Sequence, residues 1–144
     1  MQVQTTHMEL DQLLSSIDTL SSRGHWSGPV QSICYDSRQA RPGSLFVAIT
    51  GSHQDGHVFV EDAYNRGARA FLVQHEVQLP SNACVTTVES TRKALATVSA
   101  VHYNHPSRHM RVIGITGTNG KTTVAYLLQS ILPVSYTHLR AHET

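Results

Sequence analysis

The chain has 144 residues, of which 40% are hydrophobic, and its formal net charge is +1 at pH 7. This length and hydrophobic content suffice for a packed core, and the interspersed charges provide no basic face for nucleic acid. No apolar stretch approaches the roughly 18 residues of a membrane span, and the N-terminus lacks the basic-then-apolar order of a signal peptide. We therefore expect a cytoplasmic protein that neither inserts into a membrane nor binds nucleic acid.

The first part of the chain predicts one helix and then two strands. A capping-box pattern and a stripe of leucines at helical spacing predict an amphipathic helix over residues 6–20. The β-branched and aromatic run 30–35 predicts a strand, and the continuous apolar run 45–49 predicts a strand buried on both faces. A polar segment follows each of these strands, at 36–38 and at 51–57.

The middle of the chain continues the alternation of strands and helices. We predict a short helix over 59–64, strands over 69–73 and 83–88, and a helix that Ser90 caps and Pro106 ends. This order predicts an α/β domain with a mixed sheet, whose ligands bind at loops beyond the carboxyl ends of strands. The two polar segments meet that expectation, although glycine-rich turns also occur without a ligand, and the pattern leaves both interpretations open.

A glycine-rich turn lies between the apolar run 110–115 and an apolar stripe at helical spacing after it: Gly114-Ile-Thr-Gly-Thr-Asn-Gly-Lys-Thr-Thr123. A strand, a glycine-rich loop and a helix N-terminus together form a cradle for phosphate. Lys121 would reach the terminal phosphates, and the Thr122 hydroxyl would ligate Mg²⁺. Ile115 stands six residues before the lysine, where the general motif has glycine, so this is a variant loop; the alternative is a glycine-rich turn with an incidental lysine.

Cysteines and histidines give no strong metal pattern. Cys34 and Cys84 each lie in an apolar run, which favours buried free thiols over a disulfide. His102, His105 and His109 lie on both sides of a proline, so we expect a surface cluster rather than a metal site.

Taken together, these segments resemble the N-terminal part of the Mur ligase family. The resemblance rests on Asp36-Ser-Arg38 with the following Pro42–Ala48, on Gly51–Gly56, on Gly67-Ala68, and on Tyr103–Ser107 leading into the glycine-rich loop. These segments occur in the family's order over about residues 33–132. The Thr118-Asn119 pair is most similar to the ligases that add the third residue of the peptidoglycan stem peptide.

The resemblance implies two domains and a tail. Residues 1–109 would form a small domain that binds the UDP end of a UDP-N-acetylmuramoyl peptide, and 110–132 would begin a truncated ATP-binding domain. Residues 133–144 resemble a non-native terminus. The implied UDP contacts are Tyr35, Ser37, Ser52, His53 and Gln54. Arg38 would either bond to diphosphate or pair with Asp36, and both alternatives stay open.

The implied reaction is ATP-dependent amide ligation through an acyl phosphate, which adds a diamino acid to UDP-N-acetylmuramoyl-L-Ala-D-Glu. ATP would bind to Gly117, Thr118, Asn119, Gly120, Lys121, Thr122 and, less directly, Thr123, with Lys121 catalytic and Mg²⁺ on Thr122. The partners would be the UDP-linked dipeptide and the amino acid, the protein a monomer, and this segment alone inactive. The alternatives are the sister ligase that adds the terminal dipeptide, and a binding module for a UDP-sugar or nucleotide that ligates nothing.

Overall fold

The computed structural model describes residues 8–51, 54–110 and 113–131. The chain divides into two compact units, with the division after Pro106. The predicted contacts Ser52 and His53 and the predicted non-native tail 133–144 lie outside the described residues.

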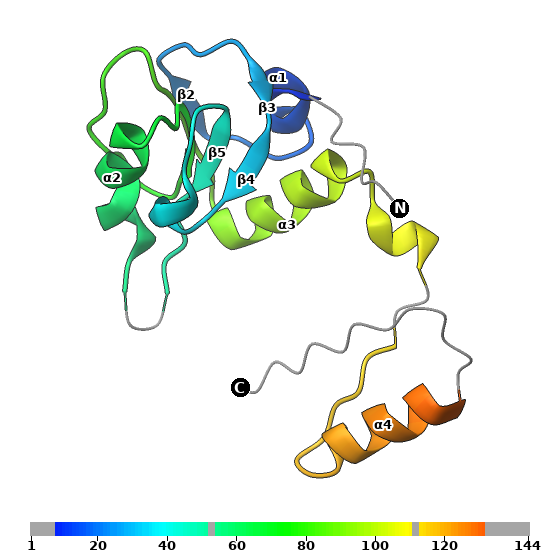
Figure 1. Ribbon diagram of the computed structural model, residues 1–144. Coiled ribbons are helices and arrows are strands. Elements are labelled where there is room, and N and C mark those ends of the chain that lie inside the picture. The colour runs from blue at the N-terminus through cyan, green and yellow to red at the C-terminus, as the bar shows by residue number, and fades with distance from the viewer. Residues whose placement is uncertain (1–7, 52–53, 111–112, 132–144) are drawn as a thin grey trace. The chain divides into compact units, whose positions relative to one another are not determined.

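The first unit is built on a mixed sheet, as predicted (Figure 1). Its five strands lie in the order β2-β7-β6-β5-β4, and the edge strand β2 was not predicted. Its strands are β2 (Ser21–Arg23), β4 (Ser32–Cys34), β5 (Ser44–Val47), β6 (Ala70–Val73) and β7 (Cys84–Thr87). The last four are mutually parallel, and β2 lies antiparallel to β7 at one edge. Every residue of β5 and β6 is buried, which explains why both strands are continuous apolar runs in the sequence.

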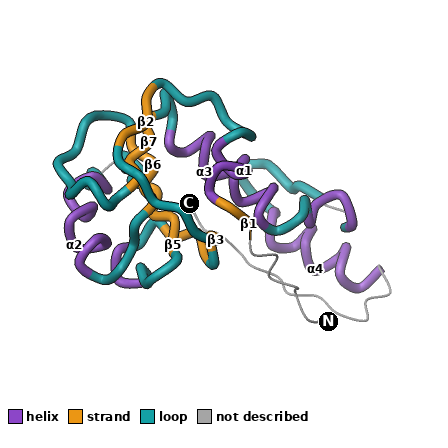
Figure 2. Tube along the Cα trace, turned by 90° about the horizontal axis from the view of Figure 1, so that it is seen from above, coloured by secondary structure: helices purple, strands orange, loops and turns teal. Residues whose placement is uncertain are grey.

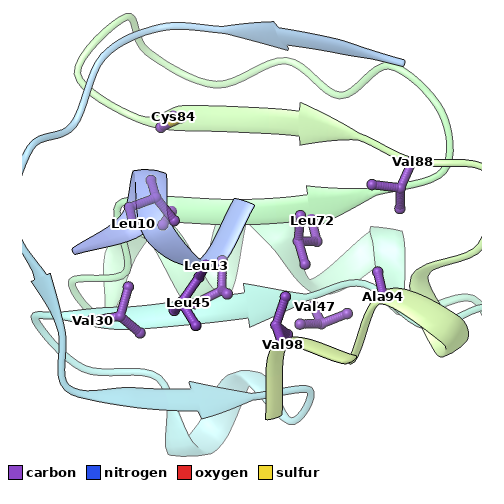
Figure 3. Close-up of a cluster of buried hydrophobic side chains, with 11 residues drawn as sticks. Leu10, Leu13, Val30, Leu45, Val47, Leu72, Cys84, Val88, Ala94 and Val98 are labelled. Atoms are coloured by element: carbon purple, nitrogen blue, oxygen red, sulfur yellow. The ribbon is translucent and has the colours of Figure 1, made fainter. Parts of the chain in front are cut away.

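Helices cover both faces of this sheet (Figure 2). Alternate side chains of β5 and β6 enter two different hydrophobic clusters, because successive residues of a strand point to opposite faces. Leu45 and Leu72 pack with α1 (Leu10–Leu14) and α3 (Thr91–His102) in one cluster (Figure 3). Phe46 and Phe71 pack in the other cluster, which includes α2 (Val60–Asn65). The domain is therefore a three-layer α/β structure.

The N-terminal helix is shorter than predicted, and the prediction for residues 15–20 is wrong. The helix ends at Leu14, and the hydroxyls of Ser15 and Ser16 donate to the carbonyls of Gln12 and Leu13 at 2.7 and 2.6 Å. Such bonds from serine compete with helix continuation. The preceding β1 (Met8–Glu9) pairs with β3 (Pro29–Val30) in a separate two-stranded sheet, so the single strand predicted over 30–35 is divided between two sheets.

Helix α3 begins as predicted, because the Ser90 hydroxyl accepts a hydrogen bond from the N–H of Lys93 at 3.3 Å. It ends at His102, before the predicted stop at Pro106. Asn104 and His105 follow in the left-handed region, with φ of 55° and 48°. Their N–H groups donate hydrogen bonds to carbonyls in the last turn of the helix, that of Asn104 to Val101 and that of His105 to Ala100. These two hydrogen bonds end the helix without a proline.

The positive φ at Asn104 leads to a prediction about stability. We expect the Asn104→Gly variant to be more stable than Asn104→Ala by about 1 kcal/mol, because an alanine Cβ clashes with the backbone at positive φ and glycine has none. Urea-unfolding midpoints of the two variants measure this difference. Equal midpoints would mean that the turn opens readily in the folded protein.

Two further sequence predictions concern buried groups. Cys34 and Cys84 are buried free thiols, as predicted, and burial raises the pKa of the Cys34 thiol. The predicted surface position is wrong for His102, which is buried on the inner side of α3, with its ring edge-on to Tyr103 at 4.8 Å between centroids.

The second unit begins at Ser107, within the 3₁₀ helix Pro106–His109. Its described residues include the glycine-rich loop and α4 (Lys121–Ile131), which confirms the predicted helix. Residues 113–115 are not in a strand, so the strand predicted over 110–115 is absent there, and residues 111–112 lie outside the described part. A strand needs a hydrogen-bonded neighbour, and the described residues offer none to this segment. The apolar side chains of Val124, Leu127 and Ile131 are exposed. Within the described ranges, no helix has both the length and the apolar character needed to cross a membrane.

Candidate functional site

The two predicted polar loops meet at one edge of the sheet. Strands β4 and β5 are parallel neighbours, with Cys34 opposite Phe46, so the loops that follow them leave the sheet side by side. Between these loops lies a cavity of about 660 Å³. It is lined by Tyr35, Asp36, Ser37, Arg38, Gln54, Phe59 and Asp62. The structure thus brings together three of the five predicted UDP contacts, namely Tyr35, Ser37 and Gln54.

The first loop is held by an aspartate and an arginine. The Asp36 carboxylate accepts a hydrogen bond from the backbone N–H of Arg38 at 3.0 Å. It also accepts two from the guanidinium, at 2.9 Å from Nε and 2.7 Å from Nη2. These bonds hold the pKa of Asp36 below its usual range, and the side-chain bond contributes most. Of the two alternatives for Arg38, the structure therefore contains the pairing with Asp36, which neutralises its charge locally.

Ser37 and Tyr35 present different chemistry to the cavity. Ser37 is buried. The hydrogen bond from its hydroxyl is the main cause that lowers the pKa of Asp62, and the hydrogen bond from Arg66 is the second. The guanidinium Nε of Arg66 lies 3.0 Å from both Asp62 oxygens. Tyr35 is 65% exposed. The cavity therefore combines an aromatic surface, a fixed hydroxyl and side chains whose charges are already balanced.

The described residues of the second loop, on either side of 52–53, return closely to the end of β5. The N–H of Gly51 donates to the Gln54 carbonyl at 3.0 Å, and the N–H of Gly56 donates to the Ile49 carbonyl at 2.9 Å. A Cβ at Gly56 would lie 2.7 Å from backbone atoms of Ile49, so only glycine fits there. This close return of the backbone places Gln54 at the cavity wall.

Phe59 and Asp62 line the cavity but were not predicted as site residues. They lie in and after the short 3₁₀ helix Gly56–Phe59, which continues directly into α2. Their sequence signal is that the helix begins immediately after the second polar loop. Side chains at its start must therefore lie at the same edge of the sheet as that loop.

Asp55, His57 and His75 form the group that could hold a metal ion among the described residues. The His57 Nδ1 lies 2.5 Å from the Asp55 carboxylate, and its Nε2 lies 2.9 Å from the backbone nitrogen of Gln74. A backbone N–H can only donate, so Nε2 accepts and Nδ1 carries the proton. Both ring nitrogens of His57 are therefore occupied, and the group is a poor metal site.

The glycine-rich loop of the second unit turns with φ of 77° at Gly120, a conformation that favours glycine. Helix α4 begins at the next residue, so its free N–H groups and positive dipole end face the loop. The Lys121 ammonium donates to the Gly117 carbonyl at 2.7 Å, and no ion pair within the described residues includes it. Its charge is therefore available to an anion, and the hydroxyl of Thr122 is an oxygen ligand of the type that Mg²⁺ prefers.

The lowered carboxyl pKa values predict loss of stability in acid. Asp36, Asp55 and Asp62 all have pKa values below the ordinary 3.8, and for Asp55 the main cause is the hydrogen bond from the backbone N–H of His57. Their stabilisation is complete above the unfolded-state pKa and is lost as the pH falls through the lower folded-state value.

We therefore expect the urea-unfolding midpoint to fall below about pH 4, with no contribution from these groups to any change between about pH 5 and pH 7. The Asp36→Asn variant should show a shallower acid decline than the unaltered protein. An acid decline of the same size in both proteins would contradict the assignment for Asp36.

An α/β domain with a cavity at the carboxyl edge of parallel strands, followed by a glycine-rich loop at a helix N-terminus, is typical of nucleotide-binding enzymes. The chain belongs to the Mur ligase family: the model of that family, described as the catalytic domain, matches residues 29–118.

Its sequence is similar to named ligases of this family. It is 41% identical over 125 residues to the UDP-N-acetylmuramoyl-L-alanyl-D-glutamate–2,6-diaminopimelate ligase of Clostridium perfringens, covering 87% of this chain and 26% of that protein. It is 40% identical over 126 residues to UDP-N-acetylmuramyl-tripeptide synthetase 2 of Oceanobacillus iheyensis, with 87% of this chain and 26% of that protein covered. The chain thus spans about a quarter of the length of these curated relatives.

Solved structures of the family have the same fold. A MurF structure from Acinetobacter baumannii matches with a TM-score of 0.68 and 27% identity, covering 86% of this chain and 27% of that one. The MurF ligase of Thermotoga maritima, solved in complex with ADP, matches with a TM-score of 0.51 and 29% identity, covering 65% of this chain and 21% of that one.

Proposed function

We propose that the whole protein is an ATP-dependent amide ligase that adds a diamino acid to UDP-N-acetylmuramoyl-L-Ala-D-Glu. Residues 1–109 would bind the UDP end of the acceptor, and 110–132 would begin the ATP-binding domain. The proposal is supported by 41% identity to a ligase named for adding 2,6-diaminopimelate to this dipeptide. The structural observation that carries it is the cavity between the loops after β4 and β5.

In this proposal the cavity holds the uracil and ribose of the acceptor. The exposed ring of Tyr35 offers a stacking surface for a base. The Ser37 hydroxyl, whose proton is directed to Asp62, can accept a hydrogen bond at a uracil or ribose edge, and the Gln54 amide can both donate and accept. Because Arg38 is already paired with Asp36, we assign it to holding the loop rather than to the diphosphate. Ser52 and His53, which lie outside the described residues, would complete the second loop.

The glycine-rich loop would bind the phosphates of ATP through the backbone N–H groups of Gly117 to Gly120 and the side chains of Lys121 and Thr122, with Thr123 at the helix start. The acceptor carboxylate attacks the γ-phosphorus, the bond to the β–γ bridging oxygen breaks, and ADP leaves. The amine of the incoming amino acid then attacks the acyl phosphate and releases inorganic phosphate. Lys121 would neutralise the charge that develops on the bridging oxygen. Mg²⁺ on Thr122 would supply further charge neutralisation.

Binding of UDP tests the proposed cavity directly. We expect Ser37→Ala to weaken UDP binding about tenfold, because one hydrogen bond to the ligand is lost. Titration calorimetry of the unaltered and variant proteins measures the dissociation constants.

The matched control is Ser15→Ala. Ser15 lines a second cavity of about 350 Å³ between the end of α1 and the start of α3, away from both polar loops. UDP affinity should not change in this variant. If Ser15→Ala weakens binding and Ser37→Ala does not, the nucleotide binds in the second cavity and the assignment is wrong.

The sister ligase is a second candidate, because a similar structure from Acinetobacter baumannii is named for adding D-alanyl-D-alanine to a diaminopimelate-containing acceptor. It matches with a TM-score of 0.67 and 26% identity, covering 91% of this chain and 29% of that one. Phosphate release by the full-length protein with UDP-linked dipeptide or tripeptide distinguishes the two, and we expect turnover with the dipeptide. UDP binding without ATP turnover on either acceptor would indicate a binding module.

A further inference from the structure

His57 lies behind the cavity wall rather than in the cavity. Its side chain is 4% exposed, and it lies between Gln54 and Phe59, two residues that line the cavity. The segment that forms this wall is therefore held at its middle by a buried imidazole.

The two nitrogens of His57 join segments that are distant in sequence. Nδ1 donates to the Asp55 carboxylate at 2.5 Å, within the second loop, and Nε2 accepts from the backbone N–H of Gln74 at 2.9 Å, at the end of β6. The first bond, with the bond from the His57 backbone N–H to Asp55 at 3.0 Å, fixes the turn. The second bond attaches that turn to the neighbouring strand.

The attachment point on β6 is itself fixed. The Gln74 side chain accepts a hydrogen bond from the Thr91 hydroxyl at 2.9 Å and donates to the Glu89 carbonyl at 3.3 Å. These residues lie where β7 passes into α3, so His57 connects the second loop to a rigid part of the fold. With the turn at Asp55–His57 held in this way, Gln54 is presented to the cavity in one arrangement, which reduces the conformational entropy lost when a ligand binds.

We propose that His57 is a positioning residue for nucleotide binding, which acts through Gln54 by fixing the second loop to the end of β6. This inference rests on the proposed function, because it takes UDP as the ligand of the cavity. His57 contacts no ligand in this proposal. Its contribution depends on the bond from the Gln74 N–H to Nε2, the bond that crosses from the loop to the sheet.

The test compares two substitutions of His57 and one of its neighbour. We expect His57→Ala to weaken UDP binding about tenfold, as measured by titration calorimetry. The reason is that the hydrogen bond that fixes the loop to β6 is lost, and one hydrogen bond contributes about this much free energy. His57→Gln should recover most of the affinity, because its amide oxygen can reach the place of Nε2 and accept from Gln74. His75→Gln is the matched control: His75 lies against the same ring, 3.8 Å between centroids, with its Nε2 3.6 Å from the Asp55 carboxylate. Its side chain does not accept the Gln74 N–H, which His57 accepts, so UDP affinity should be unchanged.

A double-mutant cycle with Gln54→Ala separates positioning from a general loss of stability. If His57 acts through Gln54, His57→Ala should change UDP affinity by less than about twofold in the Gln54→Ala background. Equal effects in both backgrounds would overturn the inference, as would full affinity of His57→Ala in the unaltered background. If His57→Ala does not fold, the cycle is run with His57→Asn, which keeps the bond to Asp55 and loses the one to Gln74.

Two other outcomes are distinguishable. If the unaltered protein does not bind UDP, the proposed function fails, and the inference fails with it. If the unaltered protein binds UDP and all His57 variants bind it with the same affinity, only the inference fails. Stabilisation of the unaltered protein by Zn²⁺ alone, lost in His75→Gln, would identify a metal site at Asp55, His57 and His75 and would overturn the positioning role.

Discussion

Replacement of Lys121 by alanine is expected to lower the ligation rate of the full-length protein by about 10²–10³-fold, the usual effect of removing one group that stabilises developing charge. The ammonium lies across the glycine-rich loop, 2.7 Å from the Gly117 carbonyl, and is exposed at the start of α4. In the proposed reaction it faces the phosphate oxygens that gain negative charge as ADP leaves. Phosphate release in the presence of the UDP-linked dipeptide and a diamino acid measures the rate.

The matched control for this substitution is Lys93→Ala. Lys93 is the chain's other lysine and lies in the first turn of α3, far in sequence from the glycine-rich loop. Its removal should leave the ligation rate within about twofold of the unaltered protein, as expected of a surface substitution away from special features. If Lys121→Ala also keeps that rate, the loop is not the phosphate site and the proposed role of Lys121 is wrong.

The second large effect is expected in the core. Phe46→Ala should lower the free energy of unfolding by about 3–5 kcal/mol, because a fully buried aromatic side chain is lost and a cavity remains. Phe46 lies on β5, which is paired on both sides, with β4 and β6, and its ring is 6.2 Å from that of Phe71 between centroids. A domain is typically stable by only about 5–15 kcal/mol, so this variant should be close to unfolding at room temperature.

Urea unfolding followed by circular dichroism measures the loss. The comparison variant is Val58→Ala, whose side chain is 66% exposed and should contribute less than about 0.5 kcal/mol. A loss below about 1 kcal/mol for Phe46→Ala would mean that the core closes around the missing ring and is less rigid than its packing indicates.

The best sequence predictions were those for elements whose pattern follows directly from burial. The runs at β5 and β6 are apolar without interruption because both faces of these strands are covered, and both were located correctly. The stripe over residues 6–20 failed because leucine spacing is compatible with a helix but does not determine its length. Serine hydroxyls end α1 after Leu14, and the expected helix residue Leu20 instead precedes β2 and is 69% exposed.

In the candidate site, too, some features could be predicted from the sequence and others needed the structure. The positions of both polar loops after strands could be predicted, because strand order along the chain is visible in the alternation of apolar and polar segments. Their closeness in space could only be expected from the rule that parallel strands carry ligands at their carboxyl ends. The choice between the two roles of Arg38 needed the structure, since its bonds to Asp36 depend on the backbone of the 3₁₀ helix Ser37–Gln39.

The sequence by itself determined the α/β class, the position of a polar loop directly after each of two strands, and the place of a glycine-rich loop before a helix; phosphate binding by that loop stays a prediction. These properties depend on local composition and on short spacing, which a chain carries before it folds. Tertiary structure alone decided the role we propose for His57, because Asp55 is its neighbour in sequence but Gln74 is 17 residues away. A hydrogen bond between distant segments exists only once the sheet has set their register, and no spacing along the chain encodes it.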